Sequence, residues 1–138
     1  MLLTLIALSF GGRNDNEFGT TVAKEGYEVQ VYSGRAAIGE RGHVRIVIYA
    51  TDGYRLDNEY DIKVSMRSPP KDVQWGQSTM HREDGSLNED GTVYTVEVPY
   101  RAGKMGDYGV SGKVKFKVCR AGQCKGGRAR FKTSVYAR

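Results

Sequence analysis

The chain has 138 residues and a formal net charge of +5, with 18 glycines, three prolines and two cysteines. This length is enough for one domain whose core needs neither a disulfide nor a metal for stability. Many glycines together with Val, Tyr and Thr favour short strands and tight turns, and argue against a protein built from long helices.

The chain opens with MLLTLIALSFGG, in which residues 2–8 are mainly apolar. This run is too short to cross a bilayer, which takes about 20 apolar residues. It fits the apolar region of a signal peptide, with Ser9 and Gly11 as the small residues before a cleavage site, although a buried N-terminal strand is an alternative. We therefore predict a signal peptide at residues 1–11, a polar leader at 12–27 and a folded domain at 28–138, with no transmembrane segment.

Apolar and polar residues alternate in several later segments, which is typical of half-buried strands. In GKVKFKVC, for example, Val114, Phe116 and Val118 alternate with lysines. The segments with this pattern are residues 28–32, 43–50, 62–67, 92–100, 112–119 and 128–135. No segment shows helical spacing, so we predict an all-β protein, an immunoglobulin-like antiparallel β-sandwich. The single tryptophan, Trp75, lies in a loop-like stretch and is expected to plug the core.

The two cysteines, Cys119 and Cys124, stand at the end of what reads as a hairpin. Alternation places Cys119 on the lysine face, near solvent. In an exported protein the pair is most simply one disulfide, which would stabilise so short a ring by about 2 kcal/mol. A metal clip is disfavoured because structural zinc needs four ligands and only His43 and His81 remain. A redox role stays open, since nearby cations (Lys115, Lys117, Arg120, Lys125 and Arg128) would favour a thiolate.

Two patches, GYRLDNEYDIKV at residues 53–64 and GKVKFKVCRAGQC at 112–124, resemble the N-terminal periplasmic domain of the thiol:disulfide interchange protein DsbD and its stand-alone secreted relatives. The resemblance covers residues 29–135. It implies an immunoglobulin-like fold and a periplasmic location. For redox-active members it also implies that Cys119 and Cys124 exchange disulfides with partner proteins.

Charge is distributed unevenly along the chain. Residues 1–100 hold ten Lys/Arg and fifteen Asp/Glu, a net −5, whereas residues 101–138 hold eleven Lys/Arg and the single acid Asp107, a net +10. If the last two strands pair, one outer face carries Lys113, Lys115, Lys117, Arg128, Arg130 and Lys132. Like charges opposite one another destabilise a sheet, and the domain would tolerate them more readily if an anionic partner met this face. The alternatives are an acidic protein, another polyanion, or a solvated face that deters strand addition.

Other chemistries find no support in the sequence. No catalytic triad can be assembled, and the acidic residues at 82–91 lack calcium-loop spacing, so that segment is expected to be an exposed turn. No cofactor or metal is expected, and nucleic acid is disfavoured because no aromatic residues are interleaved with the cations. We predict a periplasmic or secreted, non-catalytic interaction module with an acidic or thiol-bearing protein partner. A thiol–disulfide oxidoreductase using Cys119 and Cys124 is the alternative.

Overall fold

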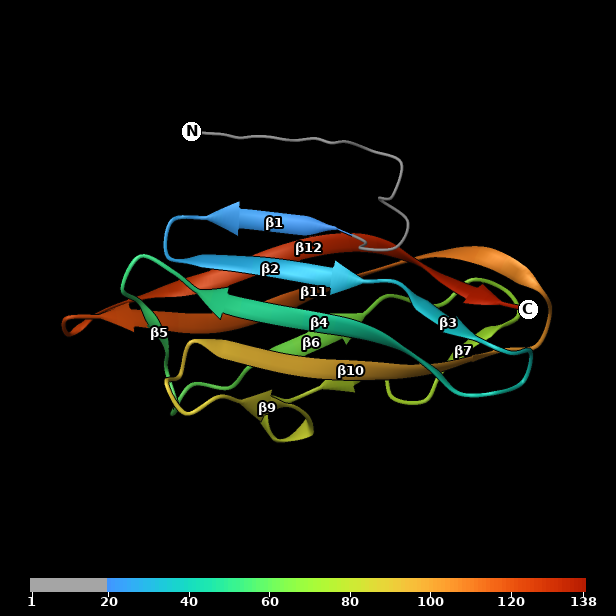
Figure 1. Cartoon of the computed structure of the whole chain (residues 1–138), viewed down its shortest axis with the longest axis horizontal. Helices are drawn as coiled ribbons and strands as arrows, with labels where there is room; N and C mark the ends of the chain where they lie inside the picture. The colour runs from blue at the N-terminus through green and yellow to red at the C-terminus, as the bar shows by residue number, and fades with distance from the viewer. Residues whose placement is uncertain (1–19) are drawn as a thin grey trace.

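The computed structural model describes residues 20–138, which form two packed β-sheets (Figure 1). The expected signal peptide, and the leader up to residue 19, lie outside the described residues. The strand order of the first sheet is β1 (Thr21–Lys24), β2 (Tyr27–Tyr32), β4 (Gly42–Ala50), β10 (Val93–Ala102) and β7 (Val73–Trp75), with β9 (Ser86–Leu87) also paired to β10. The order of the second is β3 (Gly34–Ala36), β12 (Gln123–Ala137), β11 (Gly106–Arg120), β6 (Lys63–Met66) and β8 (Thr79–Met80), with β5 (Arg55–Leu56) also paired to β11.

The topology is that of an immunoglobulin-like sandwich, which confirms the predicted fold class. The chain changes sheets between β2 and β3: β2 pairs with β4 in the first sheet, and β3 pairs with β12 in the second. The β3–β12 pairing is parallel, and the other strand pairings within residues 20–138 are antiparallel. No helix within these residues is long and apolar enough to cross a membrane.

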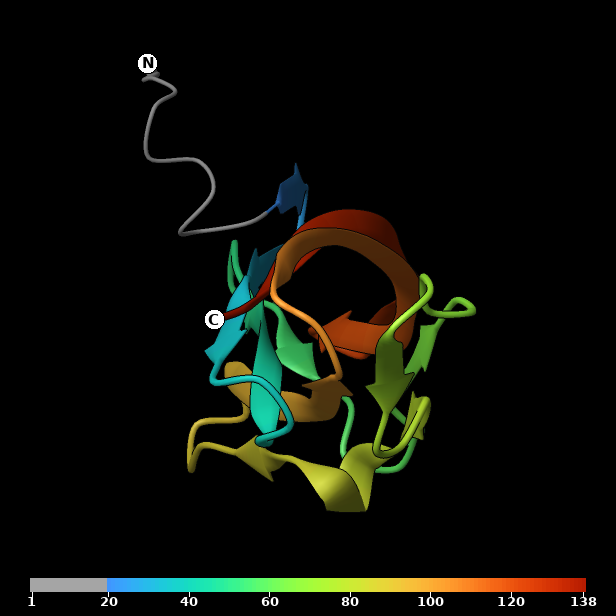
Figure 2. The ribbon, with the colours of Figure 1, turned by 90° about the vertical axis from the view of Figure 1, so that its right-hand side faces the viewer.

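The core lies between the inner faces of the two sheets. Figure 2 shows the ribbon along the long axis of the sandwich. Val44, Ile46 and Ile48 of β4 are fully buried, and so are Val114, Phe116 and Val118 of β11. Each set occupies alternate positions, so the period of two that predicted these strands also decides which side chains fill the core. The expected strands at 28–32, 43–50, 112–119 and 128–135 lie within observed strands, and those at 62–67 and 92–100 overlap β6 and β10 apart from end residues.

Tyr100 of β10 holds the two sheets together at one end. Its hydroxyl is buried and donates a hydrogen bond to the Tyr136 carbonyl of β12 at 2.9 Å. Gly34 and Gly42 make room for the ring, because a Cβ on either glycine would come within 2.6 Å of a Tyr100 ring atom. The two glycines are therefore required by packing at this point.

Several short elements differ from the sequence expectations. The strand β1 and the residue Tyr27 fall in the segment assigned to a polar leader, yet β1 is an edge strand of the first sheet and Tyr27, the first residue of β2, is buried in the core. Trp75 ends a strand, β7, and packs half-buried against the core. The segment 82–91 contains a short 3₁₀ helix, η1 (Arg82–Asp84), and β9.

Candidate functional site

The hairpin of β11 and β12 builds most of the candidate site. Each strand has 15 residues, and they pair in continuous register from Gly106 opposite Ala137 to Arg120 opposite Gln123. Odd-numbered residues of β11 and even-numbered residues of β12 point away from the core through the central part of the hairpin, as their exposure shows. The outer face of the second sheet therefore displays the lysine and arginine positions.

These cations stand in rows across the strands. Lys113 lies opposite Arg130, and Lys115 lies opposite Arg128 on one side and Lys63 of β6 on the other. All six predicted residues are on this outer face, five of them exposed and Lys117 half-buried. We call the whole set the basic face: Lys63, Arg67, Lys113, Lys115, Lys117, Arg128, Arg130 and Lys132.

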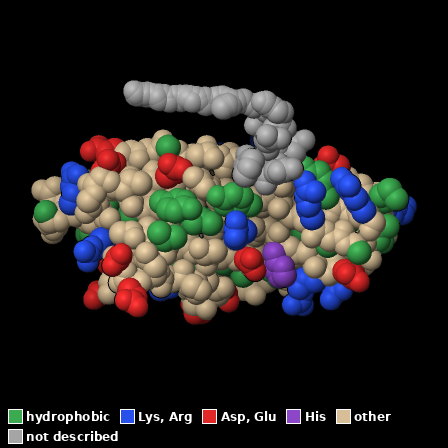
Figure 3. Space-filling model, viewed as in Figure 1, with side chains coloured by type: hydrophobic (Ala, Val, Ile, Leu, Met, Phe, Trp, Pro, Cys, Tyr) green, Lys and Arg blue, Asp and Glu red, His purple; other side chains and the backbone are tan. Residues whose placement is uncertain are grey.

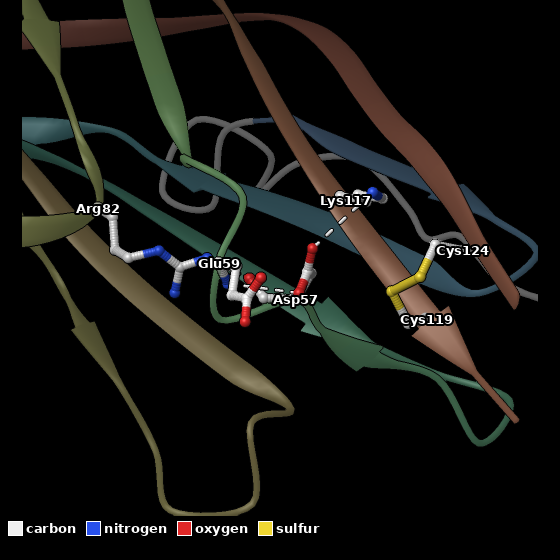
Figure 4. The surroundings of a disulfide bond; sticks show 6 residues. All are labelled: Asp57, Glu59, Arg82, Lys117, Cys119 and Cys124. Carbon is white, nitrogen blue, oxygen red and sulfur yellow. Dashed lines mark hydrogen bonds and ion pairs between the residues drawn. A yellow bond between two sulfur atoms is a disulfide. The ribbon is translucent and has the colours of Figure 1, made fainter. Parts of the chain in front are cut away.

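Little negative charge compensates the basic face. Lys117 approaches Asp57, with 4.0 Å between Nζ and Oδ2 (Figure 4). Within residues 20–138, no acidic side chain forms an ion pair with another member of the face. The first sheet differs, because Arg45 of β4 lies opposite Glu97 of β10 and its surface shows both charges interspersed (Figure 3).

The two cysteines form a disulfide, as predicted. Cys119 and Cys124 are directly opposite one another, one position before the turn of the hairpin. Cys119 is half-buried and Cys124 is exposed, so the sulfurs lie on the outer face near solvent. Arg55 of β5 lies opposite Cys119 on its other side. The turn residues Ala121 and Gly122 have φ values of 51° and 80°, a conformation that suits glycine better than alanine.

Two cations expected around the cysteines point elsewhere. Arg120 and Lys125 both lie over the ring of Tyr54, at 4.4 and 4.9 Å from its centroid. Arg120 also donates to the Asp52 carbonyl at 2.8 Å. Both belong to the side of the hairpin opposite the sulfurs, because each follows a cysteine by one position. Arg120 and Lys125 were expected to favour a thiolate. That expectation was wrong for these two residues, because their side chains lie on the other side of the hairpin from the sulfurs.

A small polar cluster fixes the connection between β5 and β6. The Nδ1 of His81 lies 2.6 Å from Oδ2 of Asp61, and the Arg82 amide donates to Oδ1 of Asp61 at 3.2 Å. Desolvation opposes ionisation of Asp61, but these hydrogen bonds outweigh it and lower the pKa of the carboxyl. The hydrogen bond to Asp61 raises the pKa of His81. The Arg82 guanidinium donates to the carbonyls of Asp57 and Tyr60, which places the loop beside Lys117.

The described residues contain no group of three or more His, Cys, Asp or Glu side chains that could hold a metal ion. Sequence reasoning found the cations of β11 and β12 but did not join Lys63 and Arg67 to them. Lys63 and Arg67 alternate with the apolar residues Ile62, Val64 and Met66. This alternation indicated that both cations point outward. Which neighbouring strand they lie beside follows from the long-range pairing of β6 with β11.

No protein-family model matches this chain, and no curated protein matches it. Among solved structures, it is similar to the N-terminal periplasmic domain of ScsB from Proteus mirabilis, with a TM-score of 0.43 and 12% identity over 86% of this chain. This chain spans 51% of that chain, about half its length. It is also similar to an ASH/PapD-like domain of human CEP192, with a TM-score of 0.40 and 10% identity over 100% of this chain and 96% of that one.

Proposed function

We propose that this protein is an exported, non-catalytic interaction module whose basic face docks an acidic protein partner. The single observation that carries the proposal is the uncompensated row of Lys63, Lys115 and Arg128 across three adjacent strands. Like charges placed directly opposite one another reduce the stability of a sheet. An acidic surface would neutralise them and would also speed association through electrostatic steering.

The disulfide supports the proposal that the protein is exported and non-catalytic, because the bond can serve a structural role. It joins the strands beside the turn of a hairpin 15 residues long on each side. Persistent disulfides belong to oxidising compartments, which agrees with a periplasmic or secreted location. In this role the bond keeps the end of the basic face ordered.

Binding of fluorescein-labelled poly-L-glutamate, followed by fluorescence anisotropy, tests the docking proposal. The variant Lys115→Gln/Arg128→Gln should weaken binding about tenfold, since it removes two charged contacts. The control Arg41→Gln/Arg45→Gln removes the same charge from two exposed positions, one just before β4 and one within it, and should change affinity by less than about twofold. Equal losses in both variants would show that net charge alone drives binding, and would overturn the proposal.

A second candidate function is thiol–disulfide exchange, favoured by the exposure of Cys124. A partner thiolate would attack Sγ of Cys124, forming a mixed disulfide and releasing Cys119 as a thiolate. A second thiolate of the partner would then attack the mixed disulfide, so that the partner leaves oxidised and both cysteines remain reduced. Lys117, two positions from Cys119 on the same face of β11, would stabilise the released thiolate.

The reduction potential of the disulfide separates this candidate from the structural role. A value of about −120 to −230 mV, obtained by equilibration in graded thiol buffers, would favour exchange. A value below about −300 mV would identify a structural bond that resists reduction by glutathione. The docking proposal predicts the lower value.

A further inference from the structure

The basic face contains a hollow of about 720 Å³ near the middle of the second sheet. Its rim brings together four cations and several hydroxyl side chains. The residues used below are Ser65, Arg67, Ser111, Lys113, Arg130 and Lys132. We call this feature the basic hollow.

Strand register places the four cations around one space. Ser65, Lys113 and Arg130 form one row across β6, β11 and β12. In the next row Ser111 lies opposite Lys132, and the Arg67 amide donates to the Ser111 carbonyl at 3.0 Å. The two rows are two residues apart along each strand, about 7 Å. Four cations from two adjacent rows therefore surround the hollow.

The backbone beneath these side chains is held firmly. Besides its amide bond to Ser111, Arg67 accepts a hydrogen bond at its carbonyl from Nε1 of Trp75 at 2.9 Å. Gly112 lies tightly packed under the hollow, because a Cβ there would be 2.7 Å from the Ser65 carbonyl oxygen. The site is therefore built on sheet backbone that would change little on binding.

The hollow has no acid among its described lining residues. Asp107 of β11 lies four residues from Ser111, about 13 Å along the strand. None of the four cations forms an ion pair within residues 20–138. Among residues 20–138, no acidic side chain therefore neutralises the four cations of the hollow.

We propose that the basic hollow is a binding site for a phosphate-bearing small ligand. A phosphate monoester carries a charge of about −1.5 to −2 at neutral pH and three acceptor oxygens, whereas a carboxylate carries only −1. Guanidinium groups such as those of Arg67 and Arg130 match phosphate oxygens with two parallel hydrogen bonds. The volume falls within the range of about 300–1,000 Å³ for small-molecule sites, so the ligand has room for more than the phosphate group.

This inference can be tested separately from docking of an acidic protein, because the hollow occupies only part of the basic face. The paired row Lys113–Arg130 belongs to the hollow, and the adjacent paired row Lys115–Arg128 does not. Replacing either pair by glutamine removes two charges, so the two double variants are matched in charge. The Lys115–Arg128 replacement also removes the repulsion between Lys115 and Lys63, whereas Lys113 faces the neutral Ser65, so urea unfolding of both variants accompanies the binding assay.

Titration of the full chain with inorganic pyrophosphate, followed by amide chemical shifts in NMR and by calorimetry, tests the proposal. We expect the largest shifts at Ser65, Ser111 and Lys113. Lys113→Gln/Arg130→Gln should weaken binding about tenfold or more, and Lys115→Gln/Arg128→Gln by less than about threefold. Acetate should bind far more weakly than pyrophosphate.

Equal weakening in both double variants, or shifts spread evenly over the basic face, would overturn the proposal, as would no saturable pyrophosphate binding. Sedimentation with phosphatidic acid vesicles, compared with phosphatidylcholine vesicles, identifies the source of the phosphate. Sedimentation lost in Lys113→Gln/Arg130→Gln alone would assign the site to a lipid headgroup. Pyrophosphate binding without sedimentation would assign it to a soluble phosphate ester. Neither result depends on the polyglutamate assay, so the hollow and the docking surface can fail independently.

Discussion

Lys115 stands at the centre of a row of three exposed cations, and the change Lys115→Glu is expected to stabilise the fold. It converts two like-charge neighbours, Lys63 and Arg128, into two opposite-charge pairs. Cross-strand pairs of this kind are each worth about 0.2–1 kcal/mol, and exposure keeps them near the lower end of that range. The change removes two repulsions and adds two attractions, each about 0.25 kcal/mol, so the total gain should be about 1 kcal/mol, or about 4 °C in Tm for a domain of this size.

Urea unfolding at low salt and at about 1 M salt provides the assay, because the screening length falls to about 3 Å at 1 M. The gain should be largest at low salt and should shrink at high salt, with Lys115→Gln giving roughly half of it. Lys115→Glu should at the same time weaken polyglutamate binding. A loss of stability at low salt, or a gain independent of salt, would refute the view that the cations repel one another across the sheet.

Three further predictions concern single side chains, each measured by denaturant or thermal unfolding. Ala121→Asn should stabilise the hairpin by about 1 kcal/mol, because Asn accepts the positive φ of 51° more readily than Ala. Thr133→Val should stabilise by about 1–2 kcal/mol, because the buried Thr133 hydroxyl has no hydrogen-bond partner among the described residues. His81→Gln should remove a pH dependence: the raised pKa of His81 means that its pairing with Asp61 stabilises the fold below the ordinary pKa of 6.5 and is lost as pH rises through the raised value.

Each of these predictions has a distinct contradicting result. A destabilised Ala121→Asn would mean that the turn does not keep its left-handed conformation in solution. A destabilised Thr133→Val would mean that the hydroxyl has a partner. For His81→Gln, an unchanged stability profile between about pH 6 and 8 would show that the contact with Asp61 does not persist. The lowered pKa of Asp61 acts in the opposite direction, since its contribution is present above the ordinary value of 3.8 and is lost as pH falls.

The longer strands could be predicted because each has one buried face. In β11 the fully buried Val114 and Phe116 alternate with exposed lysines, so the local sequence is enough to predict both the strand and its buried face. The three-residue strand β3 could not be predicted in the same way. Its parallel pairing with β12 joins residues about a hundred positions apart and leaves no periodic pattern in so short a segment.

The candidate site was predictable only in part for the same reason. Alternation placed Lys113, Lys115 and Cys119 on one face without knowledge of neighbouring strands. Local sequence did not indicate that Tyr54 would draw Arg120 away from the disulfide. The basic hollow depends on the register of three strands and on the hydrogen bonds of Arg67, which local sequence does not specify.

The most direct test of the central claim is an NMR titration of the full chain with poly-L-glutamate. The account predicts saturable amide shifts concentrated on β6, β11 and β12, with those of β4 unchanged. Shifts that are equally large around Arg45 on β4 would contradict it, because the first sheet would then bind the anion as well as the basic face does.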